Sequence, residues 1–315
     1  MATATAKSAI GAATTRRRVT RALGHWALPA FTLLAIGYLL IPIIVMIIFS
    51  FNDYQGKFNF IWGGFTLKAW ESPLAWPGLP DAIRVSLTVA ALSTVFSTIL
   101  GTMIGLALTR YQFRGRGFIN GLIFLPMASP EIVLGASLLT LFINIGLKNG
   151  ILPPGLTLLP KGTLALGFTS ILIAHIMFNI SYVVVTVKAR LSGFDRRLEE
   201  AAMDLGANEW TTFWRVTFPL IFPGIMAAAL LAFSLSIDDF VITNFNSGST
   251  ITFPLFIWGA ARVAVPPQIY VIATMIFLFT VAMMLITVWQ QRRAEKMAAV
   301  RPDEGELLAL EHAPA

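Results

Sequence analysis

The sequence has no cysteine and few charged residues for its length. Charged residues make up 12% of the 315 and hydrophobic ones 56%, whereas charged residues make up about a quarter of a soluble domain. The absence of cysteine excludes disulfides, thiolate metal ligands and thiol catalysis. The scarcity of charge excludes an ordinary soluble domain. The 23 Lys and Arg residues bracket apolar segments rather than forming one basic face, which argues against a nucleic-acid partner.

A phosphate-binding loop is also missing from the sequence. The pattern GxxxxGK[ST], which wraps phosphates with backbone amides, does not occur, and Gly56-Lys57 lacks the upstream glycine. We therefore expect no enzymatic activity, no metal site and no cofactor in this chain. If ATP drives the protein, another chain hydrolyses it.

Six apolar windows are each long enough to cross about 30 Å of hydrocarbon as a helix. The first is too long for the apolar region of a signal peptide, and no small-residue cleavage site follows it, so we expect a retained anchor. The sequence therefore predicts an all-α polytopic membrane protein with six transmembrane helices. The windows are residues 28–49, 83–108, 118–143, 164–187, 221–243 and 269–289.

The basic residues predict the orientation. With both termini in the cytoplasm, 17 Lys and Arg residues fall inside and six outside, as the positive-inside rule requires. We expect residues 1–24 and 294–315 to be disordered cytoplasmic tails around a permease domain at 25–293. Residues 50–81 should lie along the outer surface as a short lateral helix, because they carry several Trp and Pro residues.

Two local patterns modify the predicted helices. Pro126 and Pro130 interrupt the third window, because proline removes backbone hydrogen bonds. Gly101 and Gly105 are spaced for close helix packing, although chance explains that spacing about as well.

A polar segment at 188–222 separates the fourth and fifth windows and falls on the cytoplasmic side. Residues 198–205 are predicted to form a short helix that Gly206 ends, since glycine adopts the left-handed conformation cheaply. Asn208 is a suitable N-cap for a second helix, and Pro219 and Pro223 mark the entry to the next span. This segment offers a helix that a soluble partner can contact.

The same segment resembles the EAA loop of ABC importer permeases. Glu200-Ala201-Ala202, then Gly206, then Pro219 match the family spacing, while Val216 and Phe218 stand where the family has Ile and Leu. The resemblance implies a coupling helix that sits in a groove of a cytoplasmic ATPase. The coupling residues it implies, with their polar neighbours, are Glu199, Glu200, Ala201, Ala202, Asp204, Leu205, Gly206 and Pro219.

Further stretches resemble the C-type permease subunit of spermidine/putrescine importers. They are SPEIV at 129–133, VVVTV at 183–187, LSGFD at 191–195 and SIDDFV at 236–241. The resemblance implies type I importer architecture in a bacterial inner membrane. It also implies a second, homologous permease, two ATPase subunits that hold ATP and Mg, an external binding protein, and a polyamine cargo.

Three acidic residues fall inside apolar windows, where a charge costs at least about 2.5–3.5 kcal/mol. At helical rise, Glu131 lies roughly 20 Å and Asp238 and Asp239 roughly 21–22 Å from the inner ends of their helices. Carboxylates at one depth suit a cation with several ammonium groups, and aromatic rings can add cation–π contacts. The predicted substrate path comprises Glu131, Asp238, Asp239, His175, Asn179, Ser234 and Phe240.

Other interpretations stay open at this point. Glu131 could serve only to bind amides freed by Pro130, and His175 and Asn179 could serve only as hydrogen bonders between helices. Adjacent aspartates point about 100° apart on a helix, so one of Asp238 and Asp239 could pair with Arg262 or with the partner permease. The alternative functions are a permease for a metal ion, thiamine or phosphonate, and a proton-coupled secondary transporter.

Overall fold

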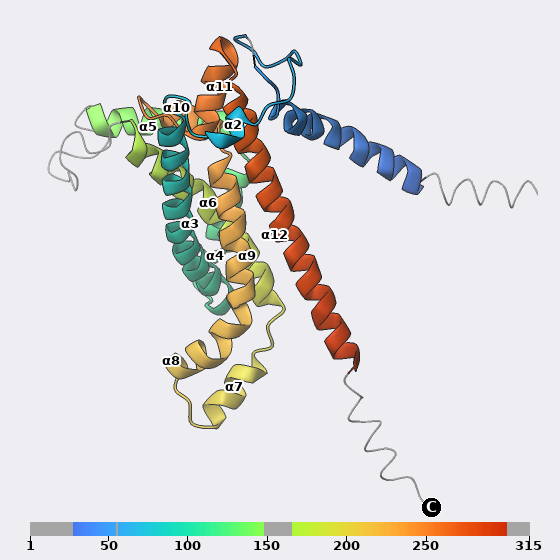
Figure 1. Cartoon of the computed structure of the whole chain (residues 1–315). Coiled ribbons are helices and arrows are strands. Elements are labelled where there is room, and N and C mark those ends of the chain that lie inside the picture. The colour runs from blue at the N-terminus through green and yellow to red at the C-terminus, as the bar shows by residue number, and fades with distance from the viewer. Residues whose placement is uncertain (1–27, 55, 148–165, 301–315) are drawn as a thin grey trace, which may run out of the picture. The chain divides into compact units, whose positions relative to one another are not determined.

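The computed structural model describes residues 28–54, 56–147 and 166–300 (Figure 1). Within these ranges the regular elements are helical, and the only strand-like pairs are isolated bridges of Asn52 with Phe65 and of Phe58 with Val265. The chain divides into two compact units, residues 1–73 with 264–315 (unit 1) and residues 74–263 (unit 2). The predicted tail at 1–24 lies outside the described residues.

Unit 2 is built around three long helices, α3 (Leu79–Arg110), α6 (Phe168–Ser192) and α9 (Phe218–Ile237). Small residues let α3 and α6 approach closely. A Cβ at Gly101 would lie 2.6 Å from Cγ1 of Val183, and one at Gly105 would lie 3.4 Å from Cγ1 of Val187. Val183 and Val187 belong to the buried cluster that α6 forms with α9, so the close-packing interpretation of the glycine pair is confirmed.

The third window is two helices rather than one. α4 (Arg116–Ala128) and α5 (Glu131–Leu147) meet at 107° across Ser129 and Pro130. Pro130 has no N–H to continue the first helix, and the residue before a proline avoids the α conformation. Ser129 is accordingly extended, with ψ of 138°. Pro126, by contrast, stays inside α4.

The fifth window also ends earlier than predicted. α9 stops at Ile237, and a short helix, α10 (Val241–Asn246), follows after a break. α10 packs on α5, where a Cβ at Gly135 would lie 2.8 Å from the ring of Phe245. α11 (Phe253–Val263) then closes unit 2 beside α3, with the Phe253 N–H donating to Ser86 Oγ at 2.8 Å.

Unit 1 contains the Leu28–Phe49 helix, a loop, the short helix α2 (Lys68–Glu71) and α12 (Pro267–Val300). The loop is organised by buried Asn52, which accepts from the Gly63 N–H at 2.7 Å and donates to the Ile61 carbonyl at 2.7 Å. The expected lateral helix is therefore confined to α2, and hydrogen-bonded loop forms the rest. α12 remains helical to Val300, past the predicted start of the second tail at residue 294.

The number of spans can be compared with the described helices by length and composition. Four are long and apolar enough to cross a membrane: Leu28–Phe49, α3, α6, and the segment Glu209–Ile237, which contains α9. The bent α4–α5 pair adds a fifth if it counts as one span, and α12 contributes the shorter apolar stretch Pro267–Ala282. The helical membrane architecture is confirmed, and six spans remain a prediction.

Candidate coupling loop and substrate path

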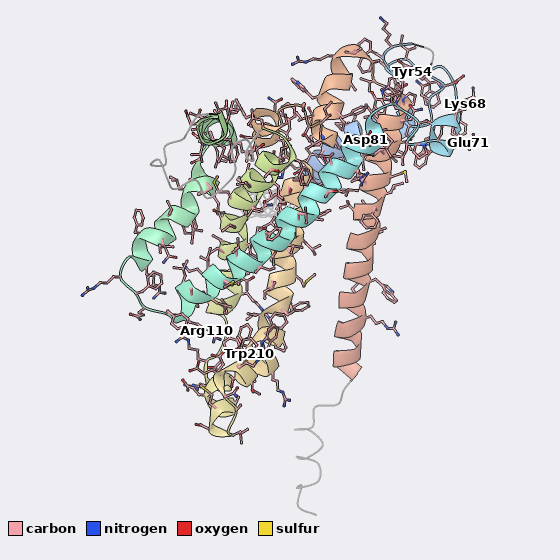
Figure 2. The ribbon with its side chains drawn as sticks, turned by 90° about the vertical axis from the view of Figure 1, so that its left-hand side faces the viewer. Tyr54, Lys68, Glu71, Asp81, Arg110 and Trp210 are labelled. Atoms are coloured by element: carbon pink, nitrogen blue, oxygen red, sulfur yellow. The ribbon has the colours of Figure 1, made fainter. Side chains whose placement is uncertain are left out.

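The polar segment between α6 and α9 folds into three short helices at one end of unit 2. They are α7 (Arg197–Asp204), α8 (Glu209–Thr212) and the π-helix η1 (Phe213–Thr217), which continues into α9. Figure 2 shows Arg110 and Trp210 at this end, and Asp81 at the other end of α3. Because α3 has 32 residues, these ends are separated by roughly 48 Å at helical rise, which exceeds the thickness of the hydrocarbon core.

Gly206 ends α7 in the way the sequence indicates. Its φ is +90°, its N–H donates to the Met203 carbonyl at 2.9 Å, and the next N–H, of Ala207, donates to the Ala202 carbonyl at 3.1 Å. This pair of bonds is the Schellman motif, which requires a left-handed residue at this position. Asn208 then caps α8 by accepting the Thr211 N–H at 2.8 Å. The predicted order of helix, glycine, cap and helix is therefore present.

An apolar surface faces outward from this loop. Leu205 is 91% exposed and Trp210 71% exposed, and Leu198 and Met203 are exposed as well. Large apolar side chains on a polar helix are an interaction feature rather than a core feature. Of the predicted coupling residues, Glu200, Ala201, Asp204, Gly206 and Pro219 are also exposed, and Ala202 is half-buried.

An aromatic row runs from this surface into α9. Trp210 contacts Trp214 with ring centroids 5.7 Å apart, Trp214 contacts Phe218 at 4.9 Å, and Phe218 contacts Phe222 at 5.5 Å. Each step is four residues, so the rings lie along one side of the helices, in edge-on or tilted contact. The row joins the exposed loop to the transmembrane helix without a gap.

Glu199 differs from the other predicted coupling residues, because its side chain points inward and is only 13% exposed. Its carboxylate accepts hydrogen bonds from the guanidinium of Arg110, at the end of α3, and from the hydroxyl of Thr217, at the end of η1. Arg196 also binds α3, by donating to the Thr109 carbonyl at 3.0 Å. Sequence reasoning missed Arg110 and Thr217, and only the position of Arg110 at the end of a basic-flanked window could have indicated it.

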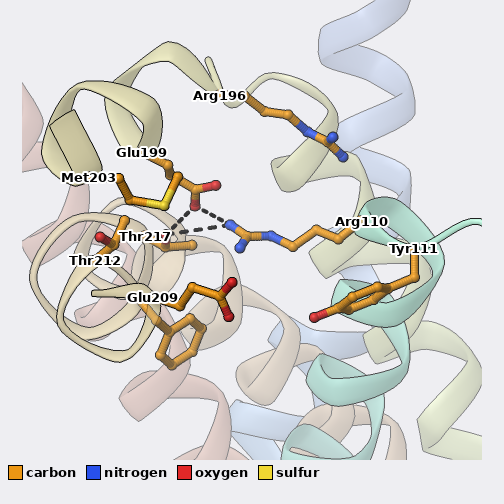
Figure 3. Close-up of a pocket in the computed structure, with 9 residues that line it drawn as sticks. Arg110, Tyr111, Arg196, Glu199, Met203, Glu209, Thr212 and Thr217 are labelled. Carbon is orange, nitrogen blue, oxygen red and sulfur yellow. Dashed lines mark hydrogen bonds and ion pairs between the residues drawn. The ribbon is translucent and has the colours of Figure 1, made fainter. Parts of the chain in front are cut away.

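A pocket of about 240 Å³ lies beside these side chains. Figure 3 shows the carboxylate of Glu199 between Arg110 and Thr217, with Glu209 and Tyr111 on the other side of the pocket. Two arginines and two glutamates line it, so its charges balance. In the described part of the chain, no group of three or more His, Asp or Glu side chains could hold a metal ion.

The two intramembrane aspartates have different environments. Asp238 follows the last residue of α9 and is exposed. The side chain of Asp239 is 6% exposed, and its Oδ2 accepts the Thr243 N–H and the Thr243 hydroxyl, each at 2.8 Å. The side chain of Asp239 thus caps α10, which explains why the fifth window breaks at this point.

His175 is buried beside Asp239. Its Nδ1 lies 2.7 Å from Ser236 Oγ, and its Nε2 lies 2.9 Å from Thr243 Oγ1 and 3.3 Å from Asp239 Oδ2. Ser93 on α3 donates to the same Ser236 hydroxyl at 2.9 Å. The structure therefore brings His175 and Asp239 together as a hydrogen-bonding group between helices, within unit 2.

The remaining predicted path residues lie on different surfaces. Asn179 is buried and donates to the Ala232 carbonyl at 3.2 Å, while Ser234 is exposed on α9. Phe240 packs on Trp258 with ring centroids 5.2 Å apart, and the guanidinium of Arg262 lies 4.8 Å from the centre of the same Trp258 ring.

Glu131 is the first residue of α5, where a carboxylate is favoured by the helix dipole. Its side chain is exposed, and the Val133 and Leu134 N–H groups donate to the Pro130 carbonyl. Since α10 packs on α5, the segment that follows Asp239 lies against the helix that Glu131 begins.

A family profile decides what this loop and these helices belong to. Residues 97–296 match the family described as "Binding-protein-dependent transport system inner membrane component". The chain belongs to this family. As a permease subunit of this family, it is a multi-pass protein of the inner membrane.

Curated relatives of this permease agree with the family. It is 39% identical to the spermidine/putrescine transport system permease protein PotC of Escherichia coli, over 79% of this chain and 88% of that one. It is 36% identical to the PotC of Haemophilus influenzae, over 82% and 93% of the two chains. The putrescine transport system permease protein PotI of Escherichia coli is 35% identical, over 84% and 90%.

Solved structures support the fold of the permease. A bacterial ABC transporter involved in the import of the acidic polysaccharide alginate matches with a TM-score of 0.58 and 18% identity, over 88% of this chain and 99% of that one. The same type of transporter in complex with a pentasaccharide-bound periplasmic protein matches with a TM-score of 0.59 and 19% identity, over 84% and 92%. The predicted ABC importer fold is therefore confirmed, and the family match with its curated relatives confirms the inner-membrane location.

Proposed function

We propose that this permease moves polyamines into the cytoplasm as part of an ATP-driven importer. The chemistry of its exposed intramembrane acids supports a cationic cargo, and its relatives carry the names of spermidine and putrescine permeases. The observation that carries the proposal is the exposed carboxylate of Asp238, at a helix break inside an otherwise apolar segment. A charge at that depth costs at least about 2.5–3.5 kcal/mol, which makes Asp238 a candidate functional residue.

The proposed assembly has this chain beside a second, different permease. Two cytoplasmic ATPase subunits hold ATP and Mg, and an external binding protein delivers the cargo. The exposed apolar surface of the loop, with Leu205 and Trp210 at its tip, is the surface we propose for ATPase docking. Both termini are then cytoplasmic, and six helices cross the membrane.

In the proposed mechanism, Asp238 and Glu131 form a weak, transient binding site for the cation. ATP-driven closure of the ATPase pair moves the loop and opens the cavity outward, and hydrolysis returns it inward. Both carboxylates are exposed, so they can contact a cation in a water-filled path, and a weak site releases the cargo that a tight site would retain. The membrane potential adds about 2.3 kcal/mol per charge per 100 mV in the inward direction.

Asp239, His175 and Asn179 have a supporting role in this mechanism. Asp239 and His175 hold the break between α9 and α10 through mutual hydrogen bonds with Thr243. Asn179 joins α6 to α9 through the Ala232 carbonyl. The proposed cargo contacts are therefore Asp238 and Glu131, with Ser234 and Phe240 as neighbours on α9 and at the helix break.

Spermidine uptake by the assembled importer tests the cargo. Asp238→Asn should keep normal membrane abundance and lower uptake at least about tenfold, equivalent to about 1.4 kcal/mol of lost stabilisation. Asp81→Asn, which removes a carboxylate at the exposed start of α3, is the matched control and should leave uptake unchanged. Full uptake with Asp238→Asn would remove this residue from the path, and no polyamine uptake by the unaltered complex would refute the cargo.

A further inference from the structure

Two adjacent glutamates at the start of α7 face different directions. Glu200 is exposed, whereas the side chain of Glu199 is 13% exposed and points toward α3. Neighbouring residues on a helix point about 100° apart, so one helix can present a carboxylate to a partner and another to its own bundle. Glu199 can therefore bind the helices of its own bundle, which Glu200 cannot reach.

Glu199 joins three segments that are far apart in the sequence. It accepts from Arg110 in the last turn of α3 and from Thr217 at the end of η1, and Arg110 Nη2 lies 3.4 Å from Thr217 Oγ1 (Figure 3). The three side chains thus form a closed triangle, which we call the Arg110 cluster. It fixes α7 to the cytoplasmic ends of both α3 and α9.

The backbone around the Arg110 cluster has two notable features. Thr217 is fully buried and ends a π-helical turn, in which the Phe218 N–H donates to the Phe213 carbonyl. Such turns are rare and are frequent at functional sites. Arg196, just before α7, supplies a second attachment to α3 through the Thr109 carbonyl at 3.0 Å. Carbonyls at a helix C-terminus lack partners within the helix, so Arg196 binds where an acceptor is available.

Another side of α7 carries the exposed Leu198 and Leu205. If a partner displaces that side of α7, the movement reaches the membrane helices through the bonds that attach the inner side of α7 to α3 and η1. In the described part of the loop, Glu199 makes the side-chain bond between α7 and α3. Arg196, the residue before α7, makes a second bond to α3. The covalent route to α9 runs through α8 and η1, where Thr217 again binds Glu199.

We propose that the Arg110 cluster transmits movement of the coupling helix to α3 and α9, with Glu199 as its positioning residue. This inference rests on the proposed function, since it requires an ATPase to move α7. Removing Glu199 or Arg110 leaves the other charge, which is largely buried, without its partner. α7 then loses a side-chain attachment to α3. ATPase docking on the outer side of α7 does not involve this cluster.

The test uses the complete importer, with its partner permease, ATPase subunits and binding protein, reconstituted in liposomes. Glu199→Gln and Arg110→Gln should keep the ATPase bound on purification and lower spermidine uptake per ATP hydrolysed by about tenfold, a typical size for coupling between sites. The charge swap Arg110→Glu/Glu199→Arg should restore most of that ratio. Arg114→Gln, an exposed arginine in the turn after α3, is the control and should leave the ratio unchanged.

Each outcome bears on the proposal. An unchanged ratio in Glu199→Gln overturns it, and so does loss of the bound ATPase, which would make Glu199 a docking residue. If the charge variants do not accumulate, Thr217→Val removes only a hydroxyl and should lower the ratio in the same direction, and an unchanged ratio there overturns the proposal. Failure of the proposed function looks different: the unaltered complex takes up no spermidine, or Leu205→Asp leaves the ATPase bound.

Discussion

Asp239 and His175 lie side by side inside unit 2, with the Oδ2 and Nε2 atoms 3.3 Å apart. The two residues come from the α9–α10 break and from the middle of α6. Ser236 and Thr243 complete the group, one on each ring nitrogen of His175. Because lipid tails are as apolar as the helices themselves, hydrogen bonds of this kind contribute to holding membrane helices together.

His175→Ala should therefore destabilise the permease. The change leaves the buried Ser236 and Asp239 side chains short of a partner, at a cost of about 1–3 kcal/mol for each unsatisfied group. The thermal unfolding midpoint in detergent should fall, and the abundance of the membrane protein with it. Ser234→Ala, on the exposed side of α9, should leave the midpoint unchanged. Equal midpoints for the two variants would contradict a structural role for His175.

Close packing of α3 on α6 gives a second prediction. Gly101→Ala places a Cβ 2.6 Å from Val183 Cγ1, so the helices must separate or Val183 must move, at a typical overpacking cost of about 1–3 kcal/mol. Gly121→Ala is the control, since nothing lies within 4 Å of a Cβ there. The unfolding midpoint should fall only for Gly101→Ala, because both Cβ and Cγ1 of Val183 lie within 2.7 Å of the added Cβ. Equal midpoints for Gly101→Ala and Gly121→Ala would contradict the close packing of α3 on α6.

The elements that follow from local chemistry are the ones the sequence predicts well. The long apolar helices, the glycine end of α7 and the Asn208 cap depend on residues close together in the chain. Proline at 130 indicates the interruption of the third window, but its 107° bend depends on how α5 packs against α10. The direction of a break is set by tertiary contacts, which one sequence does not display.

The candidate site divides along the same line. Residue type and depth identify Asp238 and Asp239, yet only the fold shows that Asp239 caps α10 while Asp238 is exposed. Likewise, the motif places Glu199 beside the coupling residues, and the fold turns it toward Arg110. Treating 221–243 as one regular helix left open which aspartate faces the path, because the bond from the Thr243 N–H to the Asp239 carboxylate exists only where the helix is broken.

The outer loop of unit 1 gives a third prediction. Asn52 is buried, and its side-chain amide binds the Gly63 N–H and the Ile61 carbonyl. Asn52→Ala removes both bonds, each worth about 0.5–1.5 kcal/mol, since Ile61 and Gly63 are exposed and water can replace the lost partner. We expect faster cleavage of the 56–66 loop by an added protease, with little change in overall unfolding. Thr88→Ala, an exposed site on α3, is the control, and equal cleavage rates would contradict the assigned role of Asn52.

The left-handed conformation of Gly206 gives the last prediction, because it separates backbone strain from steric clash. Its φ is +90°, yet a Cβ at this position would meet nothing within 4 Å. Any loss in a variant therefore comes from the backbone, at about 1–2 kcal/mol for an ordinary L-residue. Asn tolerates this region better than Val. ATPase binding should therefore be strongest with Gly at position 206, weaker with Asn and weakest with Val, where it falls about tenfold, the equivalent of about 1.4 kcal/mol.

Gly117→Val, at another glycine with open space but no positive φ, controls for adding a side chain on the same side of the membrane. Equal ATPase binding by Gly206→Val and the unaltered chain would show that the end of α7 is free to rearrange, and that docking does not depend on the Schellman turn.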